Sequence, residues 1–258
     1  MRTETLALLF GVGTAAGWVD AIAGGGGLLT LPVLLATGLP PTQALATNKL
    51  QGSFGAASAS LVFLRRGHVA LSLVLPGVLV AALAAALGAH CVQFVDTRWL
   101  RALIPLVLIA VAAWFLLRPS FGAVTGRIRL GAPAFLLLAV PAIAFYDGMV
   151  GPGTGTFLAL AGISLRGLSL TPATAQAKWL NLGSNLGSLA VFLLAGQVVW
   201  APGLAMACGQ MAGARVGAGM VIHRGGALVR PVVIVVSLAL SARLLWPTLQ
   251  TLAGLNRG

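Results

Sequence analysis

Eight apolar segments, each long enough to cross a lipid bilayer as a helix, dominate this sequence. No stretch alternates apolar and polar residues as the strands of a membrane β-barrel do. The chain is therefore predicted to be an all-α integral membrane protein. A spanning helix needs about 17 to 25 residues, and the segments that meet this length are 5–23, 43–64, 69–94, 100–117, 131–150, 172–195, 199–221 and 228–247.

Charged residues are scarce, and their placement suits a membrane protein. They make up 8% of the chain, whereas soluble domains contain about 25%. The net charge of +12 comes from arginines in short connections between apolar segments, which is typical of cytoplasmic loops rather than of a nucleic-acid-binding face. We expect a multi-pass membrane protein, with the lipid bilayer around it and no nucleic-acid partner. A second copy of the chain remains a candidate partner.

A Gly-rich signature occurs twice and divides the chain into two related halves. The first copy reads DAIAGGGGLLTLP from Asp20, and the second reads DGMVGPGTGTFL from Asp147. The only two lysines of the protein, Lys49 and Lys178, also occupy matching positions in the two halves. Because internal repeats of this kind are frequent in secondary transporters, we predict two pseudo-symmetric repeats.

Each repeat is predicted to hold about four spanning helices and one short broken or re-entrant helix. The repeats cover 1–118 and 130–258, and a basic cytoplasmic linker, 119–129, joins them. The short helix follows the Gly-rich signature in each repeat, at 28–37 and 155–165. These pieces are too short to span a bilayer comfortably.

The sequence leaves two possibilities for the direction of the two short pieces. If they turn back, the chain crosses eight times, the repeats are parallel, and the loop arginines divide seven to five between the two sides. If they reach across, there are ten crossings, the repeats are inverted, and the arginines divide eight to four. The second solution is better polarised. Both place Arg65, Arg66 and the linker in the cytoplasm.

The two signatures are predicted to break the helices within the membrane and to form an anion site there. Glycine permits unusual backbone angles and lets a ligand approach the main chain, although it also permits simple close packing. A short helix that starts at a break directs unpaired N–H groups and the positive end of its dipole toward it, as phosphate sites do. The candidate contacts are Gly24, Gly25, Gly26 and Gly27 in the first break and Gly151, Gly153 and Thr154 in the second.

Both lysines and two of the four carboxylates lie within apolar segments. Charges there cost about 2.5 to 3.5 kcal/mol on insertion scales and mark functional or paired sites. Lys49 and Lys178 are candidates to contact an anion or to balance an acidic partner, although either could extend to the interface. Asp20 and Asp147 precede the breaks, where a carboxylate can carry a proton or cap the following turn. Neutral hydrogen bonds, either to an anion or between helices, are expected from the polar residues on the helices that carry the lysines: Asn48, Gln51, Ser53, Gln176, Asn181, Ser184 and Asn185.

Another glycine pattern predicts packing. Gly209, Gly213 and Gly217 repeat at every fourth position in the segment 199–221. Small residues at this spacing let two helices approach closely in lipid. A direct role of these glycines in substrate binding is the less favoured interpretation.

The remaining reactive residues form no catalytic or metal-binding constellation. His68, His90 and His223 are widely separated and lack the spacing of metal ligands, and Cys91 and Cys208 belong to no motif. The Gly-rich breaks are not nucleotide sites, because no strand precedes them and no Walker lysine follows in register. We therefore expect no metal, no cofactor and no enzymatic activity.

The stretch GGGGLLTLP at 24–32, followed by PTQALATNK at 41–49 and echoed in the second half, resembles the TauE/SafE sulfite exporter family. The resemblance covers nearly the whole chain. It implies a bacterial inner-membrane transporter of sulfite, organosulfonates or related small sulfur or carboxylate anions, often acting in export. It also implies solute contacts at both breaks, at Thr47 to Lys49 and near Lys178. Because the second copy contains Pro152 and lacks the Thr-Asn pair, the two halves need not contribute equally.

Together these features predict a secondary transporter of a small anion, most often an exporter, that alternates access around a site at the membrane midplane. A passive anion channel on the same scaffold is the alternative. A carrier saturates and shows counterflow, whereas a channel carries a current that follows voltage. An intramembrane enzyme would need a nucleophile with a general base, or a metal cluster, and the sequence shows neither.

Overall fold

The structure is a computed structural model of the chain, and it describes residues 3–96, 98–100, 106, 110 and 128–224. Within these residues every regular element is helical, which confirms the predicted all-α fold. Most of the predicted segment 100–117, all of the segment 228–247 and most of the linker 119–129 lie outside the described residues. In chain order the elements are α1 (Thr3–Ala23), α2 (Gly26–Ala36), α3 (Pro41–Arg65), α4 (Leu71–Val92), α6 (Ala132–Ala134), the π-helix η1 (Phe135–Ala139), α7 (Val140–Met149), α8 (Thr154–Arg166), α9 (Leu170–Leu194) and α10 (Trp200–Arg224).

Three helices of the described part are long and apolar enough to cross a membrane: Thr3–Ala23, Leu71–Val92 and Ala132–Met149. The last of these runs through α6, η1 and α7. The helices α3, α9 and α10 are each 25 residues long, which also suffices for a span, but they are more polar. Helix α4 presents to the outside a row of leucines that are between 57% and 76% exposed, Leu73, Leu79, Leu83 and Leu87. Such a surface fits lipid better than water.

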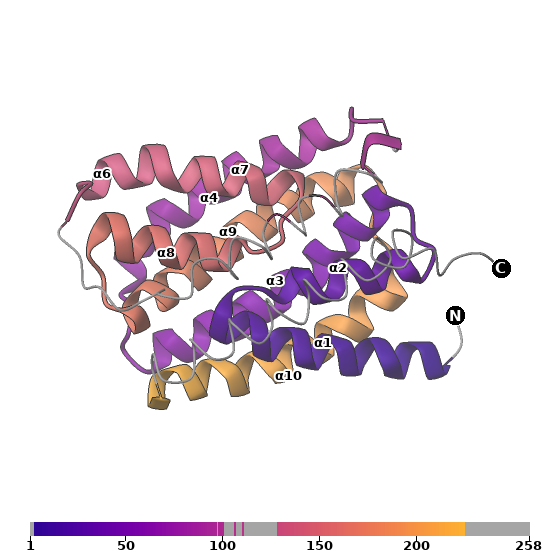
Figure 1. Ribbon diagram of the computed structural model, residues 1–258, viewed down its shortest axis with the longest axis horizontal. Coiled ribbons are helices and arrows are strands. Elements are labelled where there is room, and N and C mark those ends of the chain that lie inside the picture. The colour runs from indigo at the N-terminus through magenta and orange to yellow at the C-terminus, as the bar shows by residue number, and fades with distance from the viewer. Residues whose placement is uncertain (1–2, 97, 101–105, 107–109, 111–127, 225–258) are drawn as a thin grey trace, which may run out of the picture.

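Helices of the two predicted halves are interleaved. Helix α10 packs along α1 and α3, and α4 packs along α9 and α7 (Figure 1). The α1–α10 contact depends on small residues, because a Cβ on Gly213 would collide with the carbonyl oxygen of Thr14 and one on Gly209 with that of Phe10. A Cβ on Gly217 would likewise meet the backbone of α1. The prediction that this glycine ladder serves packing is confirmed.

Helices α1 and α7 approach the middle of the bundle from opposite ends. In Figure 1, α1 starts at the right-hand end, near the N-terminus, whereas α6 and α7 start at the left-hand end. Gly13 lies against Met206 and Gly17 against Gln210, so α1 and α10 run in the same direction. Each short helix, α2 and α8, runs antiparallel to the helix before it, so it ends on the side at which that preceding helix began (Figure 1). The two helix breaks are thereby brought to the centre of the protein.

Candidate functional site

The two glycine-rich breaks touch each other. Gly24 (φ +77°) lies in the turn between α1 and α2, and Gly151 (φ +94°) and Gly153 (φ +83°) lie in the turn between α7 and α8. These positive φ angles explain why glycine is needed at both turns. The Thr156 hydroxyl donates a hydrogen bond to the Ala23 carbonyl across the contact. A side chain on Gly24 would strike the backbone at Thr156, so the two main chains are in direct contact.

Each buried lysine pairs with the carboxylate of the other predicted half. Lys49 Nζ lies 2.8 Å from Asp147 Oδ1, and Lys178 Nζ lies 2.8 Å from Asp20 Oδ2. Both lysines are 1% exposed, Asp147 is 2% exposed and Asp20 7%, so neither lysine extends to the membrane interface. The desolvation of a buried charge is offset only by a well-placed partner. The reciprocal pairs supply that partner to all four charges and link α3 to α7 and α9 to α1.

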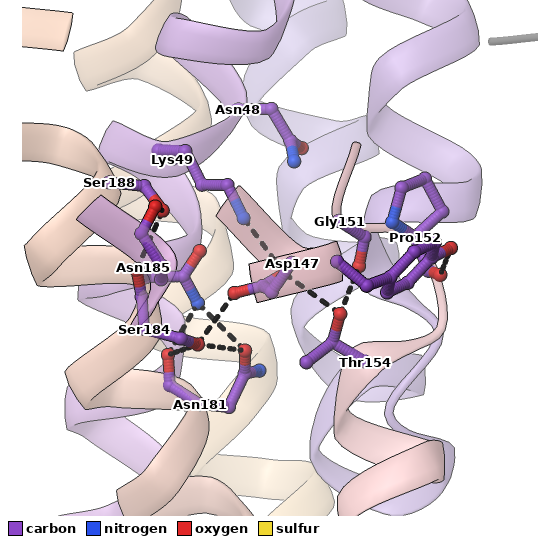
Figure 2. Close-up of polar contacts among 12 residues, drawn as sticks. Asn48, Lys49, Asp147, Gly151, Pro152, Thr154, Asn181, Ser184, Asn185 and Ser188 are labelled. Atoms are coloured by element: carbon purple, nitrogen blue, oxygen red, sulfur yellow. Dashed lines mark hydrogen bonds and ion pairs between the residues drawn. The ribbon is translucent and has the colours of Figure 1, made fainter. Parts of the chain in front are cut away.

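Asp147 also accepts hydrogen bonds from two hydroxyl groups. Thr154 Oγ1 lies 2.8 Å from Asp147 Oδ1, and Ser184 Oγ lies 2.5 Å from Asp147 Oδ2 (Figure 2). Each hydroxyl has a second acceptor within reach, the carbonyl oxygen of Gly151 at 2.7 Å from Thr154 and that of Asn181 at 3.1 Å from Ser184. A hydroxyl carries one proton, so each can turn from one acceptor to the other.

The partners of Asp20 are of another kind, because they only donate. The backbone N–H of Gly26, the first residue of α2, donates to Asp20 Oδ1 at 3.2 Å. Lys178 Nζ donates to Asp20 Oδ2 at 2.8 Å and also to the backbone carbonyl oxygen of Asp20. Asp20 therefore caps the turn that follows it, one of the two roles predicted for it. Asp147 contacts the start of α8 differently, through the hydroxyl of Thr154.

A small cavity lies where the two breaks meet. Its volume is about 30 Å³, which is room for roughly one or two water molecules. Both aspartates border it, whereas the lysines pair with them from outside the lining. The lining consists of Asp20, Gly24, Gly27, Asn48, Gln51, Gly52, Asp147, Gly151, Gly153, Thr154, Gly155, Asn181, Asn185 and Gln210.

Two clusters of uncharged polar side chains flank this cavity. On α3, Asn48 Oδ1 accepts hydrogen bonds from Thr30 Oγ1 at 2.5 Å and from Gln51 Nε2 at 2.7 Å. On α9, Asn185 Nδ2 donates to the backbone oxygen of Asn181 at 2.8 Å and to its Oδ1 at 3.0 Å. The clusters occupy the two lysine-bearing helices but differ in composition. The two sides of the cavity therefore offer different hydrogen bonds.

The predicted contact residues separate into two groups in the structure. Thr47 points to the start of α10, where its Oγ1 accepts a hydrogen bond from the N–H of Val199, the residue before the helix, at 3.1 Å. Gly26 packs against α1, since a Cβ there would lie 2.7 Å from the Cβ of Asp20. Gly25, Gln176 and the two lysines also lie outside the lining. The predicted residues that border the cavity are Gly24, Gly27, Asn48, Gln51, Gly151, Gly153, Thr154 and Asn181.

Gln210 and Gly52 border the cavity without having been predicted. Gln210 is 2% exposed and its Oε1 has no hydrogen-bond partner among the described residues. An isolated amide in an apolar segment was the available signal, but the glycine ladder marked α10 as a packing helix. A Cβ on Gly52 would lie 3.2 Å from Asn185 Oδ1, so this glycine lets α3 and α9 approach.

No group of three or more His, Cys, Asp or Glu residues that could hold a metal occurs in the described part of the chain. The ring of His90 packs edge-on against Phe94, with 5.0 Å between the ring centroids. Cys91 and Cys208 are free thiols. The lysine–aspartate pairs and the amide clusters are thus the polar groups around which a function must be sought.

An apolar helical bundle with broken helices and a charge-balanced polar centre is the architecture of a membrane transporter. The chain belongs to the family described as "Sulfite exporter TauE/SafE", whose sequence profile matches residues 9–244. It is therefore a membrane transporter of the TauE/SafE type.

Relatives described as probable membrane transporter proteins match almost the full chain. The chain is 47% identical over 240 residues to "Probable membrane transporter protein ORF9" of Sinorhizobium sp., a match that covers 93% of this chain and 92% of that protein. It is 44% identical to a protein of Haemophilus influenzae, covering 94% and 95%. It is also 44% identical to "Probable membrane transporter protein YfcA" of Escherichia coli K12, covering 93% and 90%. No solved structure matches the chain.

Proposed function

We propose that this protein is a secondary carrier that exports a small anion across the bacterial inner membrane, in which it lies as a multi-pass protein. The anion is sulfite, an organosulfonate or a related sulfur or carboxylate anion. The family description supports the substrate class and the direction. The carrier function requires no catalytic step, metal or cofactor from the chain.

The cavity between the two breaks is the observation on which this proposal depends. Helices α2 and α8 begin beside it, since Gly27 and Gly155, in the first turns, border it. The first N–H groups of a helix lack intrahelical acceptors, and the helix dipole adds positive potential at that end. The amides of Asn48 and Asn181 add neutral groups on two sides. Lys49 and Lys178 hold positive charge directly behind the two aspartates.

We infer that the two halves are inverted repeats that alternate access to this cavity. Helices α1 and α7 enter from opposite ends (Figure 1), and each half contributes the lysine for the other half's aspartate. Helices α1, α3 and α10 form one bundle, and α4, α7 and α9 form the other. Rocking of one such bundle against the other exposes a fixed site to each side in turn. Because the cavity of about 30 Å³ holds roughly one or two waters, a sulfur oxyanion enters only after the bundles separate.

Ligand binding is the first test of this function. A ligand that binds the folded state raises its melting temperature, so we expect a rise for purified protein in detergent with sulfite, ethanesulfonate or acetate. The double variant Lys49→Gln/Lys178→Gln keeps polar side chains without the positive charges, and in it the rise should disappear.

Flux through proteoliposomes then separates a carrier from a channel. We expect saturable uptake of the labelled anion that bound in detergent, together with counterflow against an excess of unlabelled anion. A non-saturating current that follows voltage would indicate the passive channel instead. Absence of both binding and flux for every one of the three anions would contradict the proposed function.

A further inference from the structure

We propose that anion transport by this site is coupled to a proton, and that Asp147 is the residue that carries it. This coupling rests on the proposed function and adds to it the identity of the coupling ion. It follows from the charge balance of the site and from the hydrogen bonds of the two aspartates.

Charge balance requires a positive charge to accompany the anion. Asp20, Lys49, Asp147 and Lys178 are all more than nine-tenths buried, and their two pairs make the empty site neutral. An anion would add an uncompensated negative charge to a region where such charge is costly. Two carboxylates border the cavity and repel the anion further. One proton bound to a carboxylate restores neutrality and removes half of that repulsion.

The hydrogen-bond partners of Asp147 suit both of its protonation states. A protonated carboxyl group donates one hydrogen bond, so it needs a neighbour that can accept one. Ser184 and Thr154 donate to the ionised carboxylate, and each has a backbone carbonyl oxygen as a second acceptor, at Asn181 and Gly151. When either hydroxyl turns to its carbonyl, its oxygen is free to accept the proton of Asp147. Only hydrogen atoms need to move.

Asp20 has no such neighbour in the described part of the protein. The Gly26 N–H and the Lys178 ammonium can only donate hydrogen bonds. A proton on Asp20 Oδ1 or Oδ2 would therefore find no acceptor among these partners. Lys178 is held in addition by the backbone carbonyl of Asp20. Asp20 accordingly stays ionised, and Lys178 stays paired with it through the transport cycle.

Few titratable groups surround Asp147. Of the described ones, Lys49 alone contacts its carboxylate. The Tyr146 hydroxyl donates to the Pro152 carbonyl oxygen at 2.6 Å. The remaining titratable groups contact partners other than Asp147 or lie at helix ends. By element, the groups are Lys49 on α3, Tyr146 on α7, Asp20 on α1, Lys178 on α9, His90 and Cys91 on α4, and Arg166 on α8, whose guanidinium donates to the Leu130 carbonyl.

Protonation of Asp147 makes Lys49 available to the anion. The Lys49 ammonium has no hydrogen-bond partner among the described residues apart from this ion pair. A Cβ on Gly151 would lie 2.9 Å from Lys49 Nζ, and Gly151 borders the cavity, so the ammonium lies directly beside a residue of the cavity lining. The step is balanced. A proton from the solution on the open side binds the Asp147 carboxylate, and the anion replaces that carboxylate as the counter-ion of Lys49.

This exchange determines which gradient drives transport. With a monoanion, the loaded site and the empty site have the same net charge, so each cycle is electroneutral. The membrane potential then does no work on the carrier. Net export follows the combined outward gradient of the anion and its proton.

Proton uptake on anion binding is the direct test. The probe is ethanesulfonate, because its sulfonate stays ionised at neutral pH and any proton taken up belongs to the protein. In weakly buffered detergent solution with a pH indicator, we expect about one proton per ethanesulfonate bound. Linkage then requires the affinity to fall about tenfold per pH unit once Asp147 is ionised in the free protein. In proteoliposomes, flux should respond to an imposed pH difference and not to a potassium–valinomycin potential.

The variants Asp147→Asn and Asp20→Asn distinguish the two aspartates. Asp147→Asn resembles the protonated state, so it should bind ethanesulfonate with no proton uptake and with an affinity that does not change with pH. Even if Asp20→Asn binds less ethanesulfonate, it should still take up about one proton for each ethanesulfonate that binds. If either variant fails to fold, the infrared difference spectrum of the wild-type protein decides, because a carboxylic-acid C=O band should appear when ethanesulfonate binds.

Three results would overturn the proton coupling while leaving the carrier intact. The first is saturable anion flux without proton uptake or an infrared carboxyl band. The second is pH-dependent binding that persists in Asp147→Asn. The third is saturable flux that follows the membrane potential. Absence of both binding and flux for ethanesulfonate, sulfite and acetate alike would overturn the proposed function and the coupling together.

Discussion

Lys49 and Asp147 form a buried ion pair, so the removal of either side chain's charge leaves the other without a counter-ion. Breaking a buried pair in this way costs about 3 to 5 kcal/mol. We expect Lys49→Met and Asp147→Asn each to lower the free energy of unfolding by about this amount, and the double variant to lose less than their sum. Reversible unfolding in detergent, analysed as a double-mutant cycle, measures the coupling.

The exposed pair of Arg98 and Asp96 is the matched control. Its N–O distance is also 2.8 Å, but the two side chains are 89% and 43% exposed. Water screens such a pair, and exposed pairs contribute little to stability. Arg98→Ala should therefore leave unfolding unchanged within error. Strict additivity of the two Lys49 and Asp147 substitutions would show that the buried contact is not an energetic pair.

The sequence predicted which charges lie in the membrane but not which of them are in contact. Charges in apolar segments are rare, so Lys49, Lys178, Asp20 and Asp147 were recognisable by residue type and position alone. The aligned copies place each aspartate ahead of the lysine of its own half. Only the contact of Lys49 on α3 with the end of α7, and of Lys178 on α9 with the end of α1, shows that the pairs are exchanged.

The neighbours Thr47, Asn48 and Lys49 show the same limit on a smaller scale. Successive residues of an α-helix are rotated by about 100°, given 3.6 residues per turn. Thr47 therefore meets the start of α10, Asn48 borders the cavity and Lys49 meets Asp147. A linear motif selects all three together, although one of them holds two helices in contact and does not border the cavity.

At the scale of helices, the α1–α10 contact is set by small residues. A Cβ on Gly213 would overlap the backbone oxygen of Thr14, and overpacking of this kind costs about 1 to 3 kcal/mol. We expect Gly213→Ala to lower the melting temperature in detergent.

Gly219, on the same helix, provides the control, because a Cβ there would have no such neighbour within 4 Å. Because alanine favours a helix over glycine by about 0.8 to 1.0 kcal/mol, Gly219→Ala should not lower it. Equal melting temperatures for the two variants would contradict the packing assignment.

The existence of the helices was predictable, and their directions were less so. The short pieces predicted at 28–37 and 155–165 are found as Gly26–Ala36 and Thr154–Arg166, because apolar length and flanking glycines mark their ends. A piece this short carries no local signal for the direction in which it runs. Loop arginines gave a modest preference, and the opposed entry of α1 and α7 depends on contacts between distant segments (Figure 1).

At the scale of the whole molecule, each bundle contains two helices from one half of the sequence and one helix from the other half. Helix α10 lies with α1 and α3, and α4 lies with α7 and α9. The lysine–aspartate pairs connect the two bundles at the breaks. A movement of one bundle against the other therefore changes the environment of both pairs, which is why a proton on Asp147 can be linked to the opening of the site.

Inverted repeats also place corresponding loops on opposite sides of the membrane. Arg66 follows α3 and Ala195 follows α9, both are exposed, and each is the C-cap residue of its helix. In a background with Cys91 and Cys208 replaced by alanine, single cysteines at the two positions report their sides by reaction with a membrane-impermeant maleimide. We expect Arg66→Cys to react only after the inner membrane is permeabilised, because arginines collect in cytoplasmic loops, and Ala195→Cys to react from the periplasm. Eight crossings with parallel repeats would place both cysteines on one side, so equal reactivity would exclude the inverted arrangement, and with it the opposed breaks on which the site at the centre depends.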